Sequence, residues 1–178
     1  MFPAAQLLWL LLAFSTSDGT DVLNHTQQAS SMKAIPPDLL ITLERTDCEG
    51  VCPMYTLRIS ADGVVVYQGK QFVRNKRKAV TRLTPEQLRQ LLAEFERVNY
   101  FSLRNRYQYP EDGCPSSGLD YPSAITSFRI NGRVRIITHD YGCREKSPDG
   151  DSRPVHPSEL FALEQRIDEI VGTSRWTR

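Results

Sequence analysis

Alternation of apolar and polar positions marks the strands of this chain. Apolar residues occupy every second position in segments 39–43 and 55–59, on either side of a short connection. A period of two puts successive side chains on opposite faces, so each segment predicts a half-buried strand. Asp62-Gly63 and Asn131-Gly132 supply the positive φ that tight hairpin turns require. We therefore expect hairpins at both dipeptides, with further strands at 64–67, 72–73 and 79–83.

Two later segments repeat apolar residues at helical spacing. In the first, Thr84 is placed as the N-cap, Pro85 takes the first helical position and Gln87 completes a capping box. Its apolar stripe consists of Leu88, Leu91, Leu92, Phe95 and Val98. The second segment ends at Gly172, a residue typical of helix stops. Its stripe consists of Leu160, Leu163, Ile167, Ile170 and Val171.

These elements follow the order strands, helix, hairpin and helix. Strands that arrive in hairpin-linked groups disfavour a parallel sheet, whose strands alternate regularly with helices. We predict an α+β domain in which two helices pack on one face of an antiparallel sheet of about five strands in hairpins.

The ends of the chain differ in pattern from this domain. An apolar run from Leu7 to Phe14 is typical of a secretory signal peptide and is too short to span a bilayer. Polar residues without periodicity follow it and predict a linker. We assign 1–17 to a signal peptide, 18–37 to a flexible linker, 38–173 to a single domain and 174–178 to a tail. This division predicts a secreted or periplasmic protein whose mature chain has no transmembrane helix.

Composition directs the search for function to local clusters. The chain has 178 residues and a formal net charge of +1, which gives no strong global field and argues against nucleic acid as a partner. One basic run is a candidate anion-binding patch, formed by Arg74, Lys76, Arg77 and Lys78. A short basic run on a hairpin tip also serves simply to keep an exposed sheet edge soluble.

The four cysteines are the main chemical signal. An even number of cysteines behind a signal-like segment predicts disulfide bonds, although four cysteines permit three connectivities. Extending the strand ladder from the Asn131-Gly132 turn sets Cys143 near the loop that contains Cys114. We therefore favour a Cys114–Cys143 bridge, which leaves Cys48 and Cys52 as a local bridge between the first two strands.

Several segments, taken in order, carry a family resemblance. They are ITLERTDCEGVCPMYTLRISADGVVVYQGK, LTPEQLRQLLAEFERVNYFSL, AITSFRINGRVRIITHDYG and LFALEQRIDEI. From Pro37 to Gly172 the chain resembles the bacterial family of domain of unknown function 6438, most distinctively in the C-x-x-x-C-P-x-Y stretch that begins at Cys48. The resemblance implies no activity, cofactor or catalytic residue. The insert GCREKSPDGDSRPVHPS departs from the usual pattern, and the pair Cys114 and Cys143 is not expected in every member.

The CEGVCP stretch also resembles the C-x-x-x-C-P motif of the thioredoxin-fold copper chaperones of cytochrome oxidase assembly. That resemblance implies copper bound by Cys48, Cys52 and a distant histidine, for which His139 is the candidate, and soft thiolates suit Cu(I). In those chaperones a helix follows the motif, whereas here a strand-like segment follows. A four-cysteine zinc site is a further alternative, although its usual C-x-x-C spacing is absent. We favour structural disulfides and no cofactor.

Common catalytic patterns are missing from the sequence, which has no G-x-S-x-G, no H-E-x-x-H and no glycine-rich phosphate loop. His139, beside Asp140, suits a surface pair rather than catalysis. We therefore expect a non-enzymatic binding or structural module of the cell envelope, whose partner is an envelope component or a protein. The alternative is a copper-binding or thiol-redox protein that uses Cys48 and Cys52.

Overall fold

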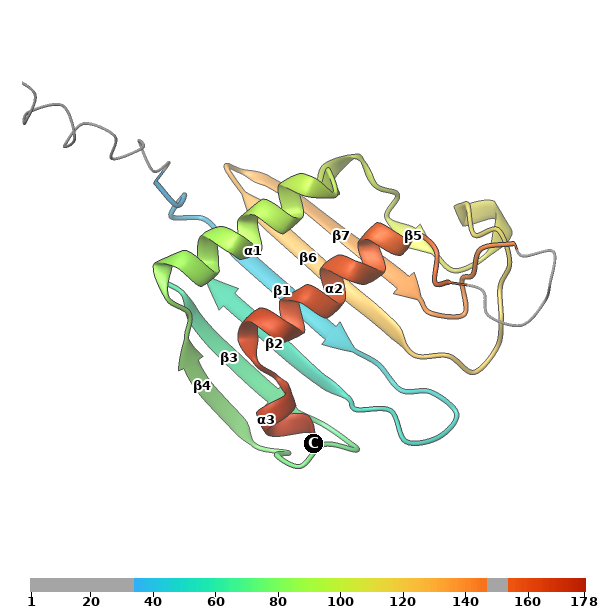
Figure 1. Cartoon of the computed structure of the whole chain (residues 1–178), viewed down its shortest axis with the longest axis horizontal. Coiled ribbons are helices and arrows are strands. Elements are labelled where there is room, and N and C mark those ends of the chain that lie inside the picture. The colour runs from blue at the N-terminus through green and yellow to red at the C-terminus, as the bar shows by residue number, and fades with distance from the viewer. Residues whose placement is uncertain (1–33, 147–153) are drawn as a thin grey trace, which may run out of the picture. The chain divides into compact units, whose positions relative to one another are not determined.

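The strands form one sheet, and the described helices α1 and α2 lie on the same face of it (Figure 1). The computed structural model describes residues 34–146 and 154–178. The strands are β1 (Leu40–Arg45), β2 (Tyr55–Ser60), β3 (Val64–Gly69), β4 (Lys78–Arg82), β5 (Arg106–Tyr107), β6 (Ser123–Ile130) and β7 (Arg133–Asp140). The helices are α1 (Pro85–Arg97), α2 (Ser158–Val171) and α3 (Ser174–Thr177), with 3-10 turns η1 (Tyr100–Ser102) and η2 (Pro110–Asp112).

The strand order across the sheet is β4-β3-β2-β1-β6-β7-β5. All neighbouring pairs are antiparallel except β5 and β7, which run parallel. On the face opposite α1 and α2, the side chains of Val80 and Ile136 are more than half exposed. The sheet therefore buries one face under the helices and leaves the other to solvent.

The α+β class agrees with the sequence, but the numbers of strands and helices differ. The sequence predicts about five antiparallel strands and two helices, whereas the described residues hold seven strands in a mixed sheet and three α-helices. β5 has two residues and α3 has four, too few for either period to be recognised. The prediction of a strand at 72–73 is wrong, because Phe72 has a φ of 52°, which lies outside the strand region.

The structure describes the C-terminal end of the chain but not the first 33 residues. The predicted signal peptide, residues 1–17, and most of the predicted linker, residues 18–37, lie outside the described ranges. Residues 174–178, expected as a tail, contain α3, and the ring of Trp176 stacks on Tyr67 with centroids 4.6 Å apart. No helix in the described ranges is long and apolar enough to cross a membrane.

Local sequence signals account for both predicted hairpins and for α1. Asn131 and Gly132 have φ values of 53° and 71°, and the residues on either side of them pair across the turn. Gly63 has a φ of 78° in the turn between β2 and β3. The Thr84 hydroxyl accepts a hydrogen bond from the backbone N–H of Gln87, whose side chain accepts one from the Thr84 N–H. These bonds confirm the predicted capping box.

The core lies between the sheet and the two long helices. Alternate residues of β1 and β2, including Ile41, Leu43 and Leu57, point toward the helices and are fully buried. Phe95 of α1 stacks on Phe128 of β6, with ring centroids 4.2 Å apart. Each large apolar side chain removed from water in this way contributes about 1.5–3 kcal/mol. The helices thus cover the apolar face that the alternation predicts.

Candidate functional site

Two disulfides close connections at one end of the sheet. Cys48 is bonded to Cys52 in the connection between β1 and β2, with 5.8 Å between their Cα atoms. Cys114 is bonded to Cys143, with 5.4 Å between Cα atoms, and joins the loop before β6 to the segment after β7. Both separations lie within the usual range for disulfides. All four cysteines of the chain lie in described residues and none is free, so the expected presence of disulfide bonds is confirmed.

His139 lies beneath α2 and not at the surface, which corrects the expectation of a surface pair with Asp140. Its side chain is fully buried, because position 139 of β7 points toward the helices. Its Nδ1 lies 3.0 Å from an Oε atom of Glu164, and its Nε2 lies 3.0 Å from the carbonyl oxygen of His156. Both ring nitrogens therefore already have partners within the protein.

Glu164 of α2 is the centre of a buried polar network. Its Oε2 accepts hydrogen bonds from the Tyr141 hydroxyl at 2.9 Å and contacts His139, while its Oε1 lies 3.5 Å from the Thr126 hydroxyl. Burial raises the pKa of Glu164 above its ordinary value, although the hydrogen bond with His139 acts in the opposite direction. The carboxyl group is thus fully enclosed and partnered within the protein.

Arg45 extends this network to the neighbouring strand. Its Nη2 donates to Asp168 at 2.7 Å and to the carbonyl oxygen of Glu164 at 3.0 Å. Tyr55 donates to the other oxygen of Asp168 at 2.6 Å. The guanidinium also donates to the hydroxyl of Tyr141, which joins the two halves. Each charged group is paired and hydrogen-bonded, the arrangement that a buried charge requires.

The predicted basic run lies in the connection between β3 and β4 and ends at Lys78, the first residue of β4. Arg74, Lys76, Arg77 and Lys78 are all exposed. The loop is held from within, since Tyr67 and Gln68 of β3 donate to the carbonyl oxygens of Asn75 and Lys76. The cationic side chains therefore project from a loop whose backbone is tied to the sheet.

The C-terminal segment packs against the same loop. The backbone N–H of Asn75 donates to the carbonyl oxygen of Trp176 at 2.9 Å, and the Arg74 guanidinium donates to that of Arg175. The guanidinium of Arg175 in turn lies 4.3 Å from the ring centre of Trp176. These contacts bring Arg175 next to a basic run about 100 residues earlier in the chain.

We call these five residues the basic cluster: Arg74, Lys76, Arg77, Lys78 and Arg175. None of them forms an ion pair within the described residues. No Asp or Glu occurs between Asp62 and Glu86, and none follows Glu169. By contrast, Arg89 of α1 is paired with a carboxylate at 2.8 Å. The basic cluster therefore combines positive charge with stretches of chain that contain no Asp or Glu.

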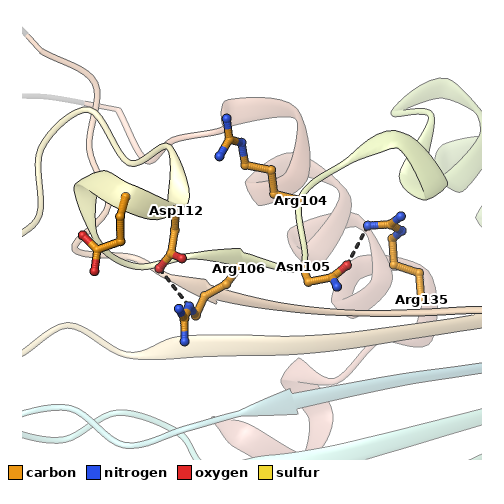
Figure 2. Close-up of a pocket in the computed structure, with 6 residues that line it drawn as sticks. Arg104, Asn105, Arg106, Asp112 and Arg135 are labelled. Atoms are coloured by element: carbon orange, nitrogen blue, oxygen red, sulfur yellow. Dashed lines mark hydrogen bonds and ion pairs between the residues drawn. The ribbon is translucent and has the colours of Figure 1, made fainter.

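A hollow of about 580 Å³ lies beside β5 and is lined by Arg104, Asn105, Arg106, Glu111, Asp112 and Arg135 (Figure 2). Arg106 is paired with Asp112 at 2.8 Å, and Arg135 donates to the side chain of Asn105 at 2.6 Å (Figure 2). The hollow is thus a mixed-charge site whose arginines are largely engaged by neighbours. The stretch that builds it has no clear periodicity, so the sequence does not indicate it.

Within the described residues, no three His, Cys, Asp or Glu side chains are grouped so that they could hold a metal ion.

Two parts of the site cannot be predicted from the sequence. The proximity of Arg175 to the basic run depends on α3, which has no sequence signal. The inward position of Glu164 depends on partners on β6 and β7, far away in the chain.

Comparison with known proteins identifies the family. A search of curated proteins gives no match. The family model described as domain of unknown function (DUF6438) matches residues 39–171, from just before β1 to the last residue of α2. The match covers most of the chain and both halves of the sheet. The chain therefore belongs to the DUF6438 family.

Proposed function

We propose that this protein is an exported, non-enzymatic binding module of the cell envelope that holds an anionic partner through the basic cluster. The single observation that carries the proposal is the cluster itself. Five exposed cations from two distant segments stand together without a carboxylate partner in the described residues. Such a surface attracts negative charge, and the attraction weakens as salt increases.

The two disulfides support the exported location. Disulfides persist in oxidising compartments and are rare in reducing ones. Each bridge stabilises a connection at the end of the sheet, Cys48–Cys52 after β1 and Cys114–Cys143 around β6 and β7. A fold stabilised by disulfides is therefore consistent with a location in the cell envelope.

The buried network supports a binding role over catalysis. His139 and Glu164 are residue types that serve as general acids or bases, yet both are fully buried and already hydrogen-bonded to each other. A general acid or base must come within hydrogen-bond reach of a substrate. This pair instead stabilises the contact between α2 and the sheet.

Titration with inorganic polyphosphate tests the proposal. The variant K76Q/R77Q/K78Q removes three cations whose side chains form no hydrogen bond in the described structure. Each lost contact with an anion is worth about 1 kcal/mol in water. We therefore expect the affinity for polyphosphate to fall at least about tenfold, and the affinity of the unchanged protein to decrease with added salt.

The matched control removes the same charge elsewhere. R82Q/R89Q/R97Q takes away two exposed arginines, Arg82 and Arg97, and the half-buried Arg89, each paired with a carboxylate, at 3.5, 2.8 and 2.8 Å. This control should bind polyphosphate like the unchanged protein. Equal losses in both triple variants, or no binding by the unchanged protein, would contradict the proposal.

A second candidate function rests on the Cys48–Cys52 bridge. Both cysteines are only partly buried, and Glu49, Gly50 and Val51 between them are exposed. A partner dithiol could transfer two electrons to this bond, leaving two thiols here and a disulfide in the partner. The two thiolates could then bind Cu(I), without His139.

Intact mass after thiol alkylation, with metal analysis of the same sample, tests this candidate. If two thiols of the exported protein react before any reduction and copper co-purifies, the redox or copper function gains support. Complete protection of all four cysteines in the absence of metal would contradict it.

A further inference from the structure

An aromatic side chain stands exposed in the same loop as the basic run. Phe72 has 45 % of its surface exposed, although a phenyl ring is usually placed in a core. Its φ of 52° is a left-handed conformation that a bulky residue rarely adopts. Residues held in such strained conformations cluster at functional sites, so Phe72 is a candidate for a functional role.

The surrounding backbone holds Phe72 in this outward position. On one side, Val73 is buried in the core. On the other, Gln71 accepts a hydrogen bond from the N–H of Met54 at 2.9 Å, and the Lys70 N–H donates to the Met54 carbonyl at 2.8 Å. Both neighbours are therefore fixed to the sheet, and the ring between them remains in solvent.

The basic cluster begins two residues after this ring. Arg74, Lys76 and Lys78 follow within six positions, and the contact between Arg74 and Arg175 adds the C-terminal segment. An exposed aromatic ring followed within a few residues of the same loop by several exposed cations matches the boundary of an anionic bilayer, where rings enter the interface and cations meet lipid phosphates. A soluble polyanion has no apolar layer to receive the ring.

We infer that the basic cluster docks the protein on an anionic lipid bilayer, with Phe72 inserted at the boundary between headgroups and acyl chains. This inference rests on the proposed function and names the partner of the same site. Each cation near an anionic surface strengthens binding about fivefold, and burial of the ring adds about tenfold. Binding therefore depends on anionic lipid and is strengthened by the ring.

A neighbouring loop provides the control. Val51 is even more exposed than Phe72, at 78 %, and lies in the disulfide-closed connection before β2. This connection also carries the exposed acidic residues Asp47 and Glu49, which an anionic surface repels. Exposure of an apolar side chain alone would make Val51 and Phe72 equivalent, whereas docking through the basic cluster singles out Phe72.

Vesicle flotation with the full chain tests the inference. Vesicles contain either phosphatidylcholine alone or phosphatidylcholine with 30 % phosphatidylglycerol, and all variants carry the same residues 1–33. We expect F72S to lower the partition coefficient on phosphatidylglycerol vesicles about tenfold and K76Q/R77Q/K78Q to lower it about a hundredfold. V51S should match the unchanged protein, and binding to phosphatidylcholine alone should be the same for all.

Contrary outcomes separate the inference from the proposed function. If F72S binds phosphatidylglycerol vesicles as well as the unchanged protein does, or V51S loses as much as F72S, bilayer docking by this ring is overturned. Tight binding of polyphosphate without vesicle binding would also overturn it while the proposed function stands. If neither probe binds, both fail.

Discussion

The cation beneath α2 is buried and paired, whereas the cations of the basic cluster are exposed and have no carboxylate partner in the described residues. Beneath α2, the guanidinium of Arg45 is buried and hydrogen-bonded to Asp168 and to the backbone of Glu164. In the basic cluster, Lys76 and Arg77 stand in solvent without a carboxylate partner in the described residues. A buried charge must be paired for the fold to form, whereas an exposed unpaired charge costs the fold little. The proposed binding surface therefore rests on exposed charges that the fold itself does not pair.

Replacing Arg45 with Met should have the largest effect on stability. The change leaves Asp168 and the backbone of Glu164 without their buried partner, and the loss of one member of a buried pair costs about 3–5 kcal/mol. Urea unfolding measures the free energy. The control is R82M, whose ion pair with Asp62 is exposed and whose removal should cost less than about 1 kcal/mol. Equal losses would show that burial does not distinguish the two pairs.

The two disulfides should also differ in how much each stabilises the protein, because they close chain segments of different length. Replacing Cys114 and Cys143 together with Ala opens a separation of 29 residues and should cost about 3–4 kcal/mol. Replacing Cys48 and Cys52 opens a separation of 4 and should cost about 2 kcal/mol. Urea unfolding of both double variants without reductant gives the comparison. A larger loss from the shorter bridge would contradict it.

Asp38 is an intermediate case, a half-buried charge that has partners. It accepts the backbone N–H of Gly132 at 2.7 Å and of Asn131 at 3.0 Å, and the bond from Gly132 is the main reason that its pKa is lowered. Because the pKa is lower in the folded state, the charged Asp38 stabilises the fold at pH values above its ordinary pKa of 3.8. This stabilisation is lost as the pH falls through the pKa of the folded state.

The variant D38N should therefore reduce the pH dependence of stability in acid. Urea midpoints between pH 7 and pH 2.5 should fall less steeply for D38N than for the unchanged protein. D62N, which removes another carboxylate with a lowered pKa at the other predicted hairpin, serves as a comparison. An unchanged pH profile in D38N would contradict the role given to these two hydrogen bonds.

The basic cluster should contribute least to stability. Because Lys76, Arg77 and Lys78 are exposed and unpaired in the described structure, K76Q/R77Q/K78Q should change the free energy of unfolding by less than about 0.5 kcal/mol. Thermal unfolding followed by circular dichroism measures this. A loss of several kcal/mol would show that the cluster is structural, which would remove the contrast with Arg45.

Local patterns in the sequence predict much of the fold. Turn dipeptides such as Asn131-Gly132 and the capping box at Thr84 act through neighbouring residues, so they can be recognised without a structure. Alternation finds β1 and β2 because every second residue is buried. β5 and α3 are too short to carry a period, and they form because the rest of the domain holds them.

The candidate site is only partly readable for the same reason. The run at Arg74 is visible in the sequence, and its role in anion binding remains a prediction. The addition of Arg175 depends on Trp176 stacking against Tyr67 of β3, which joins distant segments. The sequence does not indicate the burial of His139, because a polar residue at an inward position looks like a surface residue until its partners are known.

Mapping of polyphosphate binding by backbone amide chemical shifts tests the central claim most directly. The account predicts that the largest shifts occur at residues 70–78 and 174–178, at the basic cluster, and that they disappear in K76Q/R77Q/K78Q. Shifts centred instead on Arg104, Asn105 and Arg135, in the mixed-charge hollow, would contradict the account and place the anion site beside β5.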